Sequence, residues 1–382
     1  MRIGVNALYL IPGGVGGTEI YLRSLLTALA EIDHHNHYFI FTNCETGPDL
    51  VPGQANFTRA PQAVHAANRP ARLLWEQTLL PLTVLRRRID VLLNPGFTAP
   101  ILCGCPQVTV FHDLQHKRHP EYFRWFDLPF WNFFLFWSVA VSRLIVAVSG
   151  ATADDLERWY RLPASRIRTV PSGVDPHFFD LAACRRPEPF LLAVSTLHPH
   201  KNLDGLLRAF AIFREDHPEY RLIVSGIHGF YSSELHALRD RLQLSDRVEF
   251  PGWIPREQLY DLYARAAAFL YPSLFEGFGL PVLEAMACAT PVVATATGGI
   301  LEVVADGETG LLVPIEQGGD ASFEPDNPAQ FSHDLAQAIN RLLSDPALRE
   351  RMGRAGRERV EKLFSWGAIA QRTVDLYESL AK

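Results

Sequence analysis

The chain has 382 residues, more than the roughly 250–300 that one hydrophobic core usually organises, so two domains are expected. Hydrophobic residues make up 48% of the chain and charged residues 20%, which is typical of a globular protein and excludes a disordered one. The formal net charge of −6 argues against a nucleic-acid partner, because nucleic-acid binders usually present a strongly basic face.

Cysteine usage and hydropathy bear on the compartment. The five cysteines include no CxxC pair, which favours reduced thiols over a disulfide framework or a zinc module. The first apolar run ends at Pro12, unlike that of a secretory signal peptide. The most apolar stretch, 128–142, contains Pro129 and Asn132 and is shorter than the roughly 18–20 residues needed to span a bilayer. We expect a cytoplasmic protein without a transmembrane segment.

Short apolar runs alternate with amphipathic stretches along the chain, which is typical of parallel βαβ units. A glycine-rich loop and an amphipathic helix follow the first of these runs. Residues 1–170 are therefore predicted to form an N-terminal Rossmann-like domain. Its strands are predicted at 2–8, 38–43, 91–96, 107–113 and 143–149.

A proline-rich segment without helical periodicity, 171–188, is predicted to link the two domains. Residues 189–364 are predicted to form a second Rossmann-like domain, and 365–382 a closing helix capped by Ser365. The fold class is therefore α/β, with two doubly wound parallel sheets whose carboxyl ends face a shared cleft. Strands of the second domain are predicted at 189–195, 220–226, 247–253, 267–273, 290–295 and 309–314.

The loop after the first strand is rich in glycine, with Gly13, Gly14, Gly16 and Gly17 close together. A dinucleotide fingerprint does not fit, because Glu19 stands where the third glycine would be. The interpretation that we favour is a bare backbone loop that approaches the phosphate or sugar of a ligand ahead of a helix N-terminus. The alternative is a glycine turn of purely local use.

His112 and Asp113 end an apolar strand, at the edge of a parallel sheet where ligands bind. An isolated histidine is most often a structural residue with satisfied hydrogen bonds. A His-Asp pair at this position favours a site instead, in which the imidazole hydrogen-bonds a hydroxyl or carbonyl of the substrate.

Lys201 stands directly before a helix that is predicted to start around Asn202. An ammonium beside a helix N-terminus attracts a polyanion both by its charge and through the free N–H groups of the first turn. The alternative is a solvated lysine in a loop. His198 and His200 form an H-x-H pattern, which is a weak indication of a metal site.

The segment "SLFEGFGLPVLEAMA" carries two carboxylates, with Glu276 in a glycine turn and Glu284 about one turn into the next helix. As a general acid and base they would have to flank one bond. A shared strand–helix turn more naturally holds two parts of one long polar ligand, with hydroxyl groups bound by the acids and a phosphate or sugar oxygen by the loop N–H groups.

These residues together resemble a family 4 retaining glycosyltransferase of the GT-B fold, similar to mannosyltransferases of bacterial surface polysaccharides. The resemblance covers nearly the whole chain and is densest from Val248 to Val313. "FEGFGLPVLE" matches the E-x7-E element of the family, and "PSGVD" and "FSW" match elements at the domain junction and at the last helix. Ala289 stands where the family has glycine, a difference expected to matter little.

The resemblance implies a nucleotide-diphosphate sugar as co-substrate, such as GDP-mannose or a UDP-sugar, and no further cofactor. It implies that Glu276 contacts the hydroxyls of the donor sugar, that Glu284 binds the ribose and that Lys201 neutralises the diphosphate. Many members carry arginine at the position of Thr196, and some relatives with threonine there carry arginine at the position of His200. Neutralisation of the diphosphate therefore rests more heavily on Lys201.

The remaining donor contacts are also implied by the resemblance. The base of the nucleotide would lie near Trp253 and Ile254, after the strand at 247–253. Backbone N–H groups would hold the phosphate and sugar, and they belong to Phe278, Gly279 and Leu280.

In the N-terminal half, the resemblance implies that His112 lies over the transferred sugar and that Gly16 and Gly17 close the loop on the phosphate side. The helix at 365–382 would cross back to the N-terminal domain. The implied mechanism is front-face displacement in which Lys201, His112 and Glu276 form the catalytic set. No D-x-D triplet is present, so a metal-independent reaction is expected.

Two other functions remain open from the sequence. A GT-B sugar-nucleotide epimerase would use the same cleft but needs no acceptor. A non-catalytic sugar-nucleotide-binding protein would be expected to have lost one of the site residues, and here both glutamates, Lys201 and His112 are all present.

The acceptor is expected to be a glycan, a lipid-linked sugar or a small molecule. The segment 122–137 is rich in aromatic residues, and the favoured interpretation is a helix packed on the N-terminal core. The alternative is peripheral contact with the inner face of the plasma membrane, in which this helix, Arg69, Arg72 and the arginines at 86–88 touch a bilayer. The sequence does not indicate an oligomeric state.

Overall fold

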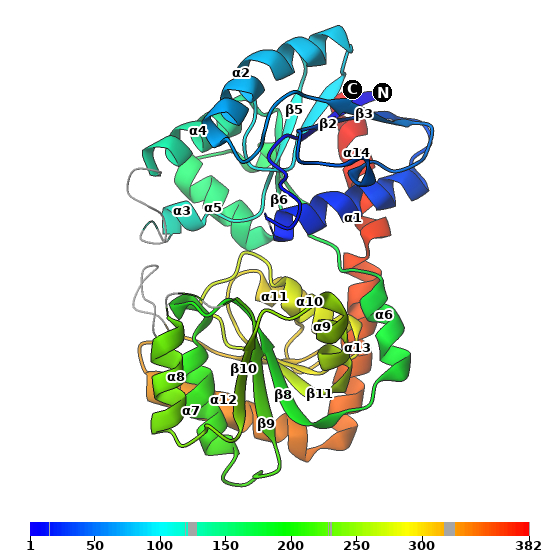
Figure 1. Ribbon diagram of the computed structural model, residues 1–382. Coiled ribbons are helices and arrows are strands. Elements are labelled where there is room, and N and C mark those ends of the chain that lie inside the picture. The colour runs from blue at the N-terminus through cyan, green and yellow to red at the C-terminus, as the bar shows by residue number, and fades with distance from the viewer. Residues whose placement is uncertain are drawn as a thin grey trace. The chain divides into compact units, whose positions relative to one another are not determined.

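The chain divides by its internal contacts into two units, Met1–Gly173 with Trp366–Lys382, and Val174–Ser365. Each unit is a parallel β-sheet with helices packed on it (Figure 1). The computed structural model describes the whole chain apart from Val15, His119, 121–127, His228, Phe230, 317–324 and Lys382.

The first unit contains a seven-stranded sheet in the order β3-β2-β1-β4-β5-β6-β7, and every neighbouring pair is parallel. The strand order reverses between β1 and β4, as in Rossmann-like sheets. The strands are β1 (Arg2–Ala7), β2 (His37–Thr42), β3 (Phe57–Pro61), β4 (Val91–Asn94), β5 (Gln107–Phe111), β6 (Leu144–Ala147) and β7 (Ile167–Thr169).

The helices of the first unit include the last one of the chain. The C-terminal helix packs along the first helix, and the ring of Trp366 lies 5.6 Å from the ring of Tyr21. A side chain at Gly173 would overlap this same indole, which explains the glycine there. The helices are α1 (Gly17–Ile32), α2 (Arg69–Arg86), α3 (Gln115–Arg118), α4 (Leu128–Val141), α5 (Gly150–Tyr160) and α14 (Trp366–Ala381).

The second unit contains a six-stranded parallel sheet in the order β10-β9-β8-β11-β12-β13. Its order reverses between β8 and β11. The strands are β8 (Glu188–Val194), β9 (Arg221–Ser225), β10 (Val248–Gly252), β11 (Ala266–Tyr271), β12 (Val292–Thr295) and β13 (Leu311–Val313). All six residues of β11 are buried, as expected for a central strand covered on both faces.

Helices cover both faces of the second sheet, with α7, α8 and α12 on one side and α6, α9 and α13 on the other (Figure 1). The helices are α6 (His177–Leu181), α7 (Leu203–Phe213), α8 (Ser232–Arg241), α9 (Arg256–Arg265), α10 (Leu280–Ala287), α11 (Ile300–Val303), α12 (Pro328–Ser344) and α13 (Pro346–Phe364).

The sequence-based prediction of two Rossmann-like α/β units is confirmed, and each predicted strand overlaps one observed strand. The prediction missed β3 and β7. Both are the outermost strands of the first sheet, where one edge is unpaired and the requirement for apolar residues is weaker. The sequences "FTRAP" and "IRT" are short and each carries an arginine, so neither forms the continuous apolar run that indicates a buried strand.

The segment 171–188 is divided between the two units after Gly173. From Val174 onward it belongs to the second unit, where Val174 forms a parallel bridge with Ser365 and the ring of Phe178 packs 4.8 Å from Tyr260. The stretch includes the short helix α6. The closing helix begins at Trp366, directly after Ser365.

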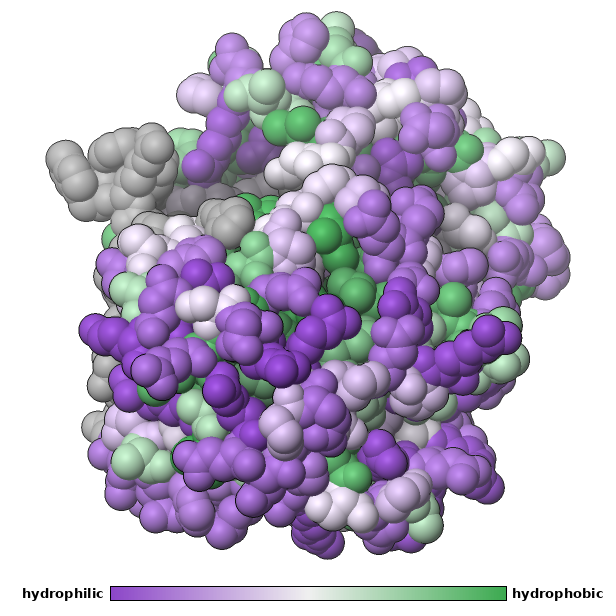
Figure 2. Space-filling view, turned by 60° about the horizontal axis from the view of Figure 1, so that its bottom comes forward, coloured by the Kyte–Doolittle hydropathy of each residue, from purple (hydrophilic) through white to green (hydrophobic). Residues whose placement is uncertain are grey.

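Within the described residues, no helix combines the length and apolar character needed to cross a bilayer. Hydrophilic residues predominate on the face shown in Figure 2, and hydrophobic residues form smaller areas between them.

Ala289 lies in a backbone conformation that disfavours side chains. It follows the last turn of α10 with φ +57°, and its N–H donates to the carbonyl of Met286 at 2.9 Å. This is the left-handed position after a helix, where glycine is the usual residue. The expectation that alanine at this position matters little is therefore wrong for stability. A residue with a Cβ in the left-handed region costs about 1 kcal/mol relative to glycine.

We predict that Ala289→Gly raises the free energy of unfolding by about 0.5–1 kcal/mol, since it removes the steric cost of the left-handed conformation. Urea unfolding followed by circular dichroism measures the change. Ala287→Gly is the control, because that residue lies inside α10 and its replacement should destabilise the protein. Equal destabilisation by both changes would contradict the explanation.

Candidate functional site

The loops after β8 and β11 meet where the strand order of the second sheet reverses, which is where Rossmann-like sheets bind ligands. Lys201 lies in the first loop and Glu276 in the second. The backbone N–H of Leu274 donates to the carbonyl of His200 at 2.8 Å and ties the loops together. The fold therefore brings together two residues that are 75 positions apart in the sequence.

Lys201 and Glu276 form an ion pair through Nζ and Oε1, and only 13% and 12% of their side chains are exposed. The hydroxyl of Tyr271 lies 3.5 Å from the same Nζ, and Lys201 also sits 5.6 Å from the centre of the Tyr271 ring. Burial, together with the negative charge of Glu276, raises the pKa of Tyr271 well above its usual value, so the phenol stays neutral. The site thus holds one cation and one anion that neutralise each other in a largely dry environment.

The Gly-Phe-Gly turn contributes backbone groups. Phe278 is buried and its ring packs 5.9 Å from that of Phe364, so its side chain anchors the loop. Gly279 caps α10 with φ +102°, and Leu280 is the first residue of the helix. Among the described residues, none accepts a hydrogen bond from the N–H groups of Phe278, Gly279 or Leu280. These three donors, at the positive end of α10, suit an anionic ligand.

Gly298 and Gly299 fix the backbone of this turn. A Cβ at Gly298, which has φ +47°, would lie 2.2 Å from the carbonyl oxygen of Glu276, and one at Gly299 would lie 2.5 Å from that of Gly277. The N–H of Gly299 donates to the carbonyl of Glu276 at 3.0 Å. Sequence analysis assigned no role to these glycines, although two adjacent glycines after a strand are a signal of close backbone approach.

Glu284 lies about one turn into α10 and accepts a hydrogen bond from the hydroxyl of Tyr263 at 2.8 Å. Burial raises its pKa to about 7, although the Tyr263 hydrogen bond and the charge of Arg256 favour the ionised form. The charges of Glu276 and Glu284 both raise the pKa of Tyr271, in addition to its burial. Their environments differ, since Glu276 has a cation at contact distance and Glu284 has a neutral donor.

Arg256, Asp175 and Tyr260 form a cluster near Glu284 that sequence analysis did not identify. The Asp175 carboxylate accepts from Arg256 Nη2 at 2.7 Å and from the Tyr260 hydroxyl at 2.6 Å. These contacts, opposed by burial, lower the pKa of Asp175. Asp175 belongs to the "PSGVD" segment, but no motif pointed to Arg256 or Tyr260.

Three other predicted donor-binding residues lie on loops of the same sheet edge. Thr196 follows β8, is half-buried, and accepts at its carbonyl from the N–H of His198 at 2.9 Å. Trp253 follows β10 and is 70% exposed, while its neighbour Ile254 is half-buried. An exposed indole at this edge provides a flat apolar surface.

In the first unit, His112 follows β5 directly. Its Nε2 lies 3.0 Å from the carbonyl oxygen of Pro95, and since a carbonyl only accepts, Nε2 carries the proton and Nδ1 keeps a lone pair. Burial lowers the pKa of His112 to about 4, so the ring is neutral at pH 7. The rings of Tyr21 and Phe97 meet it edge-on at 5.0 and 5.3 Å.

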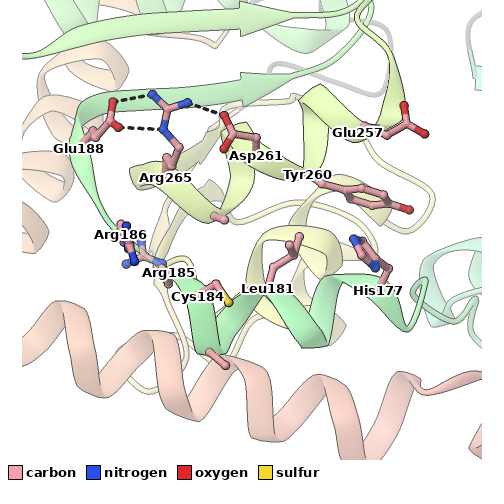
Figure 3. A pocket seen from close by; sticks show the side chains of 12 residues that line it. His177, Leu181, Cys184, Arg185, Arg186, Glu188, Glu257, Tyr260, Asp261 and Arg265 are labelled. Carbon is pink, nitrogen blue, oxygen red and sulfur yellow. Dashed lines mark hydrogen bonds and ion pairs between the residues drawn. The ribbon is translucent and has the colours of Figure 1, made fainter.

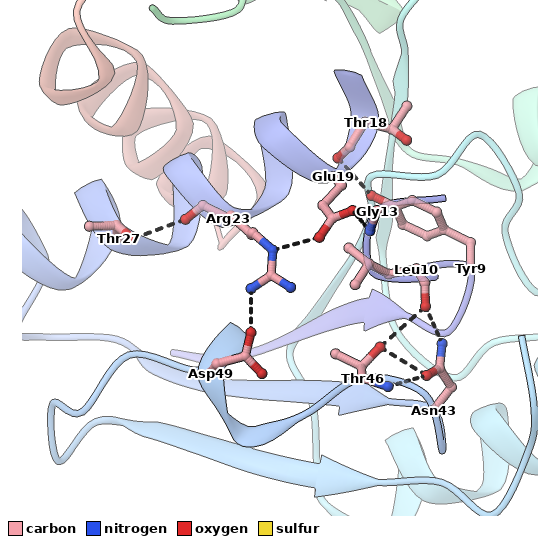
Figure 4. Close-up of polar contacts among 10 residues, drawn as sticks. All are labelled: Tyr9, Leu10, Gly13, Thr18, Glu19, Arg23, Thr27, Asn43, Thr46 and Asp49. Atoms are coloured by element: carbon pink, nitrogen blue, oxygen red, sulfur yellow. Dashed lines mark hydrogen bonds and ion pairs between the residues drawn. The ribbon is translucent and has the colours of Figure 1, made fainter. Parts of the chain in front are cut away.

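The glycine loop of the first unit is anchored by Glu19, the residue that breaks the dinucleotide fingerprint (Figure 4). Its carboxylate accepts from the N–H of Gly13 at 2.8 Å and pairs with Arg23 at 2.8 Å. Gly16 has φ +60° and precedes Gly17, the first residue of α1. Apart from its two chain neighbours, no described residue has an atom within 4 Å of the position of a Cβ at Gly16, so a ligand can approach the backbone there.

Within the described part of the chain, no group of three or more His, Cys, Asp or Glu side chains is arranged to hold a metal ion. The rings of His198 and His200 are 5.9 Å apart.

Two Rossmann-like parallel-sheet units are the architecture of glycosyltransferases of the GT-B fold, and two family models assign the chain to this class. Residues 182–359 match the model of the group 1 glycosyl transferases, and residues 15–178 match that of Glycosyltransferase Family 4. The chain belongs to this family, and the resemblance inferred from its motifs is confirmed.

The relatives include enzymes that act on different sugars. O-antigen chain mannosyltransferase B of Escherichia coli is 31% identical over 284 residues, which cover 72% of this chain and 70% of that protein. Alpha-maltose-1-phosphate synthase of Mycobacterium tuberculosis is 30% identical over the full length of both chains. The structure of HepE from Anabaena in complex with UDP and glucose has a TM-score of 0.72 and 21% identity, and it covers 100% of both chains.

The raised pKa of Glu284 makes stability depend on pH. The unfolded carboxyl loses its proton near pH 4.5 and the folded one near pH 7, so this group lowers the stability of the folded chain as the pH rises between those values. We predict that Glu284→Gln raises Tm relative to wild type by more at pH 8 than at pH 5. Thermal unfolding at both pH values tests this, and a difference in Tm that does not change with pH would contradict the assigned shift.

Proposed function

We propose that the enzyme transfers a hexose from a nucleotide-diphosphate sugar to a glycan, lipid-linked or small-molecule acceptor with retention of anomeric configuration. The observation that carries this proposal is the Lys201–Glu276 ion pair beside the free N–H groups that open α10. An ammonium and a helix N-terminus suit a diphosphate, and a carboxylate suits sugar hydroxyls. A single ligand that contains both a diphosphate and sugar hydroxyls would give Lys201 and Glu276 each a new partner in place of the other.

The surroundings of Lys201 support a polyanionic ligand. The hydroxyl of Ser195 and the side-chain amide nitrogen of Asn202 are buried and have no partner among the described residues. Buried donors without partners usually mark the place of a ligand or water. In the proposed complex Lys201 and the N–H groups of residues 278–280 bind the diphosphate. The hydroxyl of Thr196 also contacts the diphosphate, at the position where many family members carry an arginine.

Glu276 would then bind the hydroxyls of the donor sugar and Glu284 those of the ribose. Glu284 in its ionised form can accept from both hydroxyls of a diol, while Tyr263 holds the carboxylate in place. The nucleotide base would lie against Trp253 and Ile254, where stacking on the exposed indole is favourable.

The first unit supplies the remaining contacts of the proposal. His112 would contact the transferred sugar as a neutral acceptor through Nδ1, because Nε2–H is held by Pro95. Gly16 and Gly17 would bring bare backbone close to the phosphate side of the ligand.

In the proposed step the bond between the anomeric carbon and the diphosphate oxygen breaks, and the oxygen keeps the electron pair. The acceptor hydroxyl bonds to the same face of the sugar, and its proton passes to the departing phosphate. Lys201 and the first turn of α10 stabilise the negative charge that develops on the leaving group. No metal ion takes part in this step.

The donor is proposed to be GDP-mannose or a UDP-sugar. The Escherichia coli relative is named as a mannosyltransferase, which favours testing GDP-mannose. The Anabaena structure contains UDP and glucose, which favours testing UDP-sugars. A panel of UDP-, GDP- and dTDP-sugars can be screened by thermal shift, since a bound donor raises Tm by mass action.

With the donor that gives the largest shift, we predict that Lys201→Ala lowers kcat by more than about tenfold, because it removes the cation facing the leaving group. Release of the nucleoside diphosphate in the presence of a panel of glycan and sugar-phosphate acceptors measures turnover. Lys362→Ala is the matched control, as that lysine is exposed on α13 and should leave kcat unchanged.

Unchanged turnover in Lys201→Ala would refute the proposed role of the lysine. The assay also separates the alternative functions. An epimerase would release the nucleoside diphosphate and an altered sugar without any acceptor, and a non-catalytic binding protein would give a thermal shift without turnover.

We also propose that α2 and α4 contact an anionic bilayer that presents a lipid-linked acceptor. In α4 only Leu135, Ser138 and Val139 are buried, while Phe133 and Phe136 are 50% and 54% exposed. One side of α4 packs on the core as the favoured interpretation expects, because Leu135 and Val139 belong to a buried cluster with Phe111, while 122–127 lies outside the described residues. Exposed leucines on α2 are Leu74, Leu79, Leu82 and Leu85.

Arginines accompany these apolar side chains. The Arg69 guanidinium lies 4.3 Å from the centre of the Trp131 ring. Arg86 ends α2, and Arg87 and Arg88 follow it. Arg72, which was expected in the same contact, is buried and does not belong to this surface. Apolar side chains next to cations are typical of helices that lie on an anionic membrane surface.

We predict that the protein co-sediments with vesicles containing anionic phospholipid at low salt and less at moderate salt, because exposed charges are screened. The double change Phe133→Ser and Phe136→Ser should lower the bound fraction severalfold. Leu301→Ser replaces an equally exposed leucine of the second unit and serves as the control. Absence of co-sedimentation at low salt would rule out the membrane contact.

A further inference from the structure

A cavity in the described part of the second unit lies at the amino ends of its strands, the edge opposite to Lys201. Its volume is about 580 Å³, within the range of small-ligand sites. Pro187 before β8, Ala267 near the start of β11 and Ala289 before β12 form its apolar floor. The charged lining residues are Arg185, Arg349, Glu350, Arg354 and Arg357.

One face of α13 supplies most of these charges. Arg349, Glu350, Arg354 and Arg357 are separated by intervals of one to four residues, which places them on adjacent turns of the same side of the helix. Glu350 pairs with Arg354 at 3.0 Å at the exposed rim. Among the described residues, no carboxylate lies within ion-pair distance of Arg349 or Arg357.

Arg185 is held in place from the other side of the cavity. Its Nη2 donates to the carbonyl of Ala266 at 2.7 Å and its Nε to the Thr290 hydroxyl at 3.3 Å, so neutral groups fix the guanidinium. Burial, with a smaller contribution from the charge of Arg349, lowers the pKa of Arg185 to about 10. The side chain is still cationic at pH 7, and the charge of a bound anion would raise its pKa again.

The neighbouring cavity of about 1010 Å³, which shares Arg185, shows a different charge arrangement (Figure 3). There Arg265 pairs with Glu188 through two contacts of 2.8 Å and also with Asp261, so its charge is neutralised within the protein. Arg349 and Arg357 have no comparable partners among the described residues. The larger cavity is lined by three arginines and three carboxylates, whereas the smaller one is lined by four arginines and one carboxylate.

We propose that the cavity lined by Arg185, Arg349 and Arg357 is a second binding site, distinct from that at Lys201, for a compact soluble compound with two neighbouring phosphate groups. Four guanidinium groups and one carboxylate leave an excess of three positive charges, close to the charge of a diphosphate at neutral pH. Planar guanidinium groups bind phosphate oxygens in pairs. Among the described residues, no exposed large hydrophobic side chain lines the cavity, which disfavours a membrane surface as the occupant.

Inorganic pyrophosphate is the probe for this site, and isothermal titration calorimetry measures its binding. We predict that the double change Arg349→Gln and Arg357→Gln raises Kd by at least about tenfold, the expected effect of removing charge-assisted contacts. Arg351→Gln is the control, since Arg351 is exposed on the same helix and does not line the cavity. Orthophosphate should bind the wild-type site at least about tenfold more weakly than pyrophosphate.

The site at Lys201 also attracts phosphates, so each titration is repeated in Lys201→Ala. The proposal requires that pyrophosphate still binds to Lys201→Ala and still raises its Tm, and that adding the two α13 changes raises this Kd by at least about tenfold and reduces the rise in Tm. Loss of all pyrophosphate binding in Lys201→Ala alone would overturn it, as would equal affinity in the α13 double variant. Binding to anionic vesicles without binding of pyrophosphate would also overturn it.

Discussion

The ammonium of Lys201 and the carboxylate of Glu276 neutralise each other in the unliganded chain, and the surrounding loops are built to keep them in contact. Each charge has lost most of its water, so neither can be left alone without a cost of several kcal/mol. A ligand that separates them must supply a partner for both. A nucleotide-diphosphate sugar contains an anion and a set of hydroxyls within one molecule, which is why the pair is the centre of the functional proposal.

The two acids of the E-x7-E segment illustrate how environment divides roles between identical side chains. Glu276 faces a cation, whereas the pKa of Glu284 is raised to about 7 by burial beside a tyrosine. His112 likewise is neutral at pH 7 and has a defined tautomer because Pro95 accepts from Nε2. These differences arise from neighbours rather than from residue type.

The sequence predicted the two-unit fold and most of the strands, because buried parallel strands carry continuous apolar runs that can be recognised without a structure. The sequence also placed Lys201 and Glu276 in loops after strands, and the fold brings these two side chains into one ion pair. Their roles in donor binding, like that of Glu284, stay predictions. The sequence did not predict Arg256 or the arginine cavity, since Arg185 and Arg357 are far apart in the chain and carry no local pattern. The strain at Ala289 was underestimated because a positive φ depends on how the helix ends, which the residue itself does not reveal.

Gly298 and Gly299 have a consequence for any attempt to redesign sugar selectivity. Their backbone lies directly against the carbonyls of Glu276 and Gly277, so the turn that carries the acid is held by main-chain contacts that do not depend on which sugar is present. Substitutions within this turn would therefore disturb the main-chain contacts that hold Glu276 in place. Variation among substrates is therefore better sought in side chains that are not clamped in this way, such as Thr196 and Trp253 on the neighbouring loops.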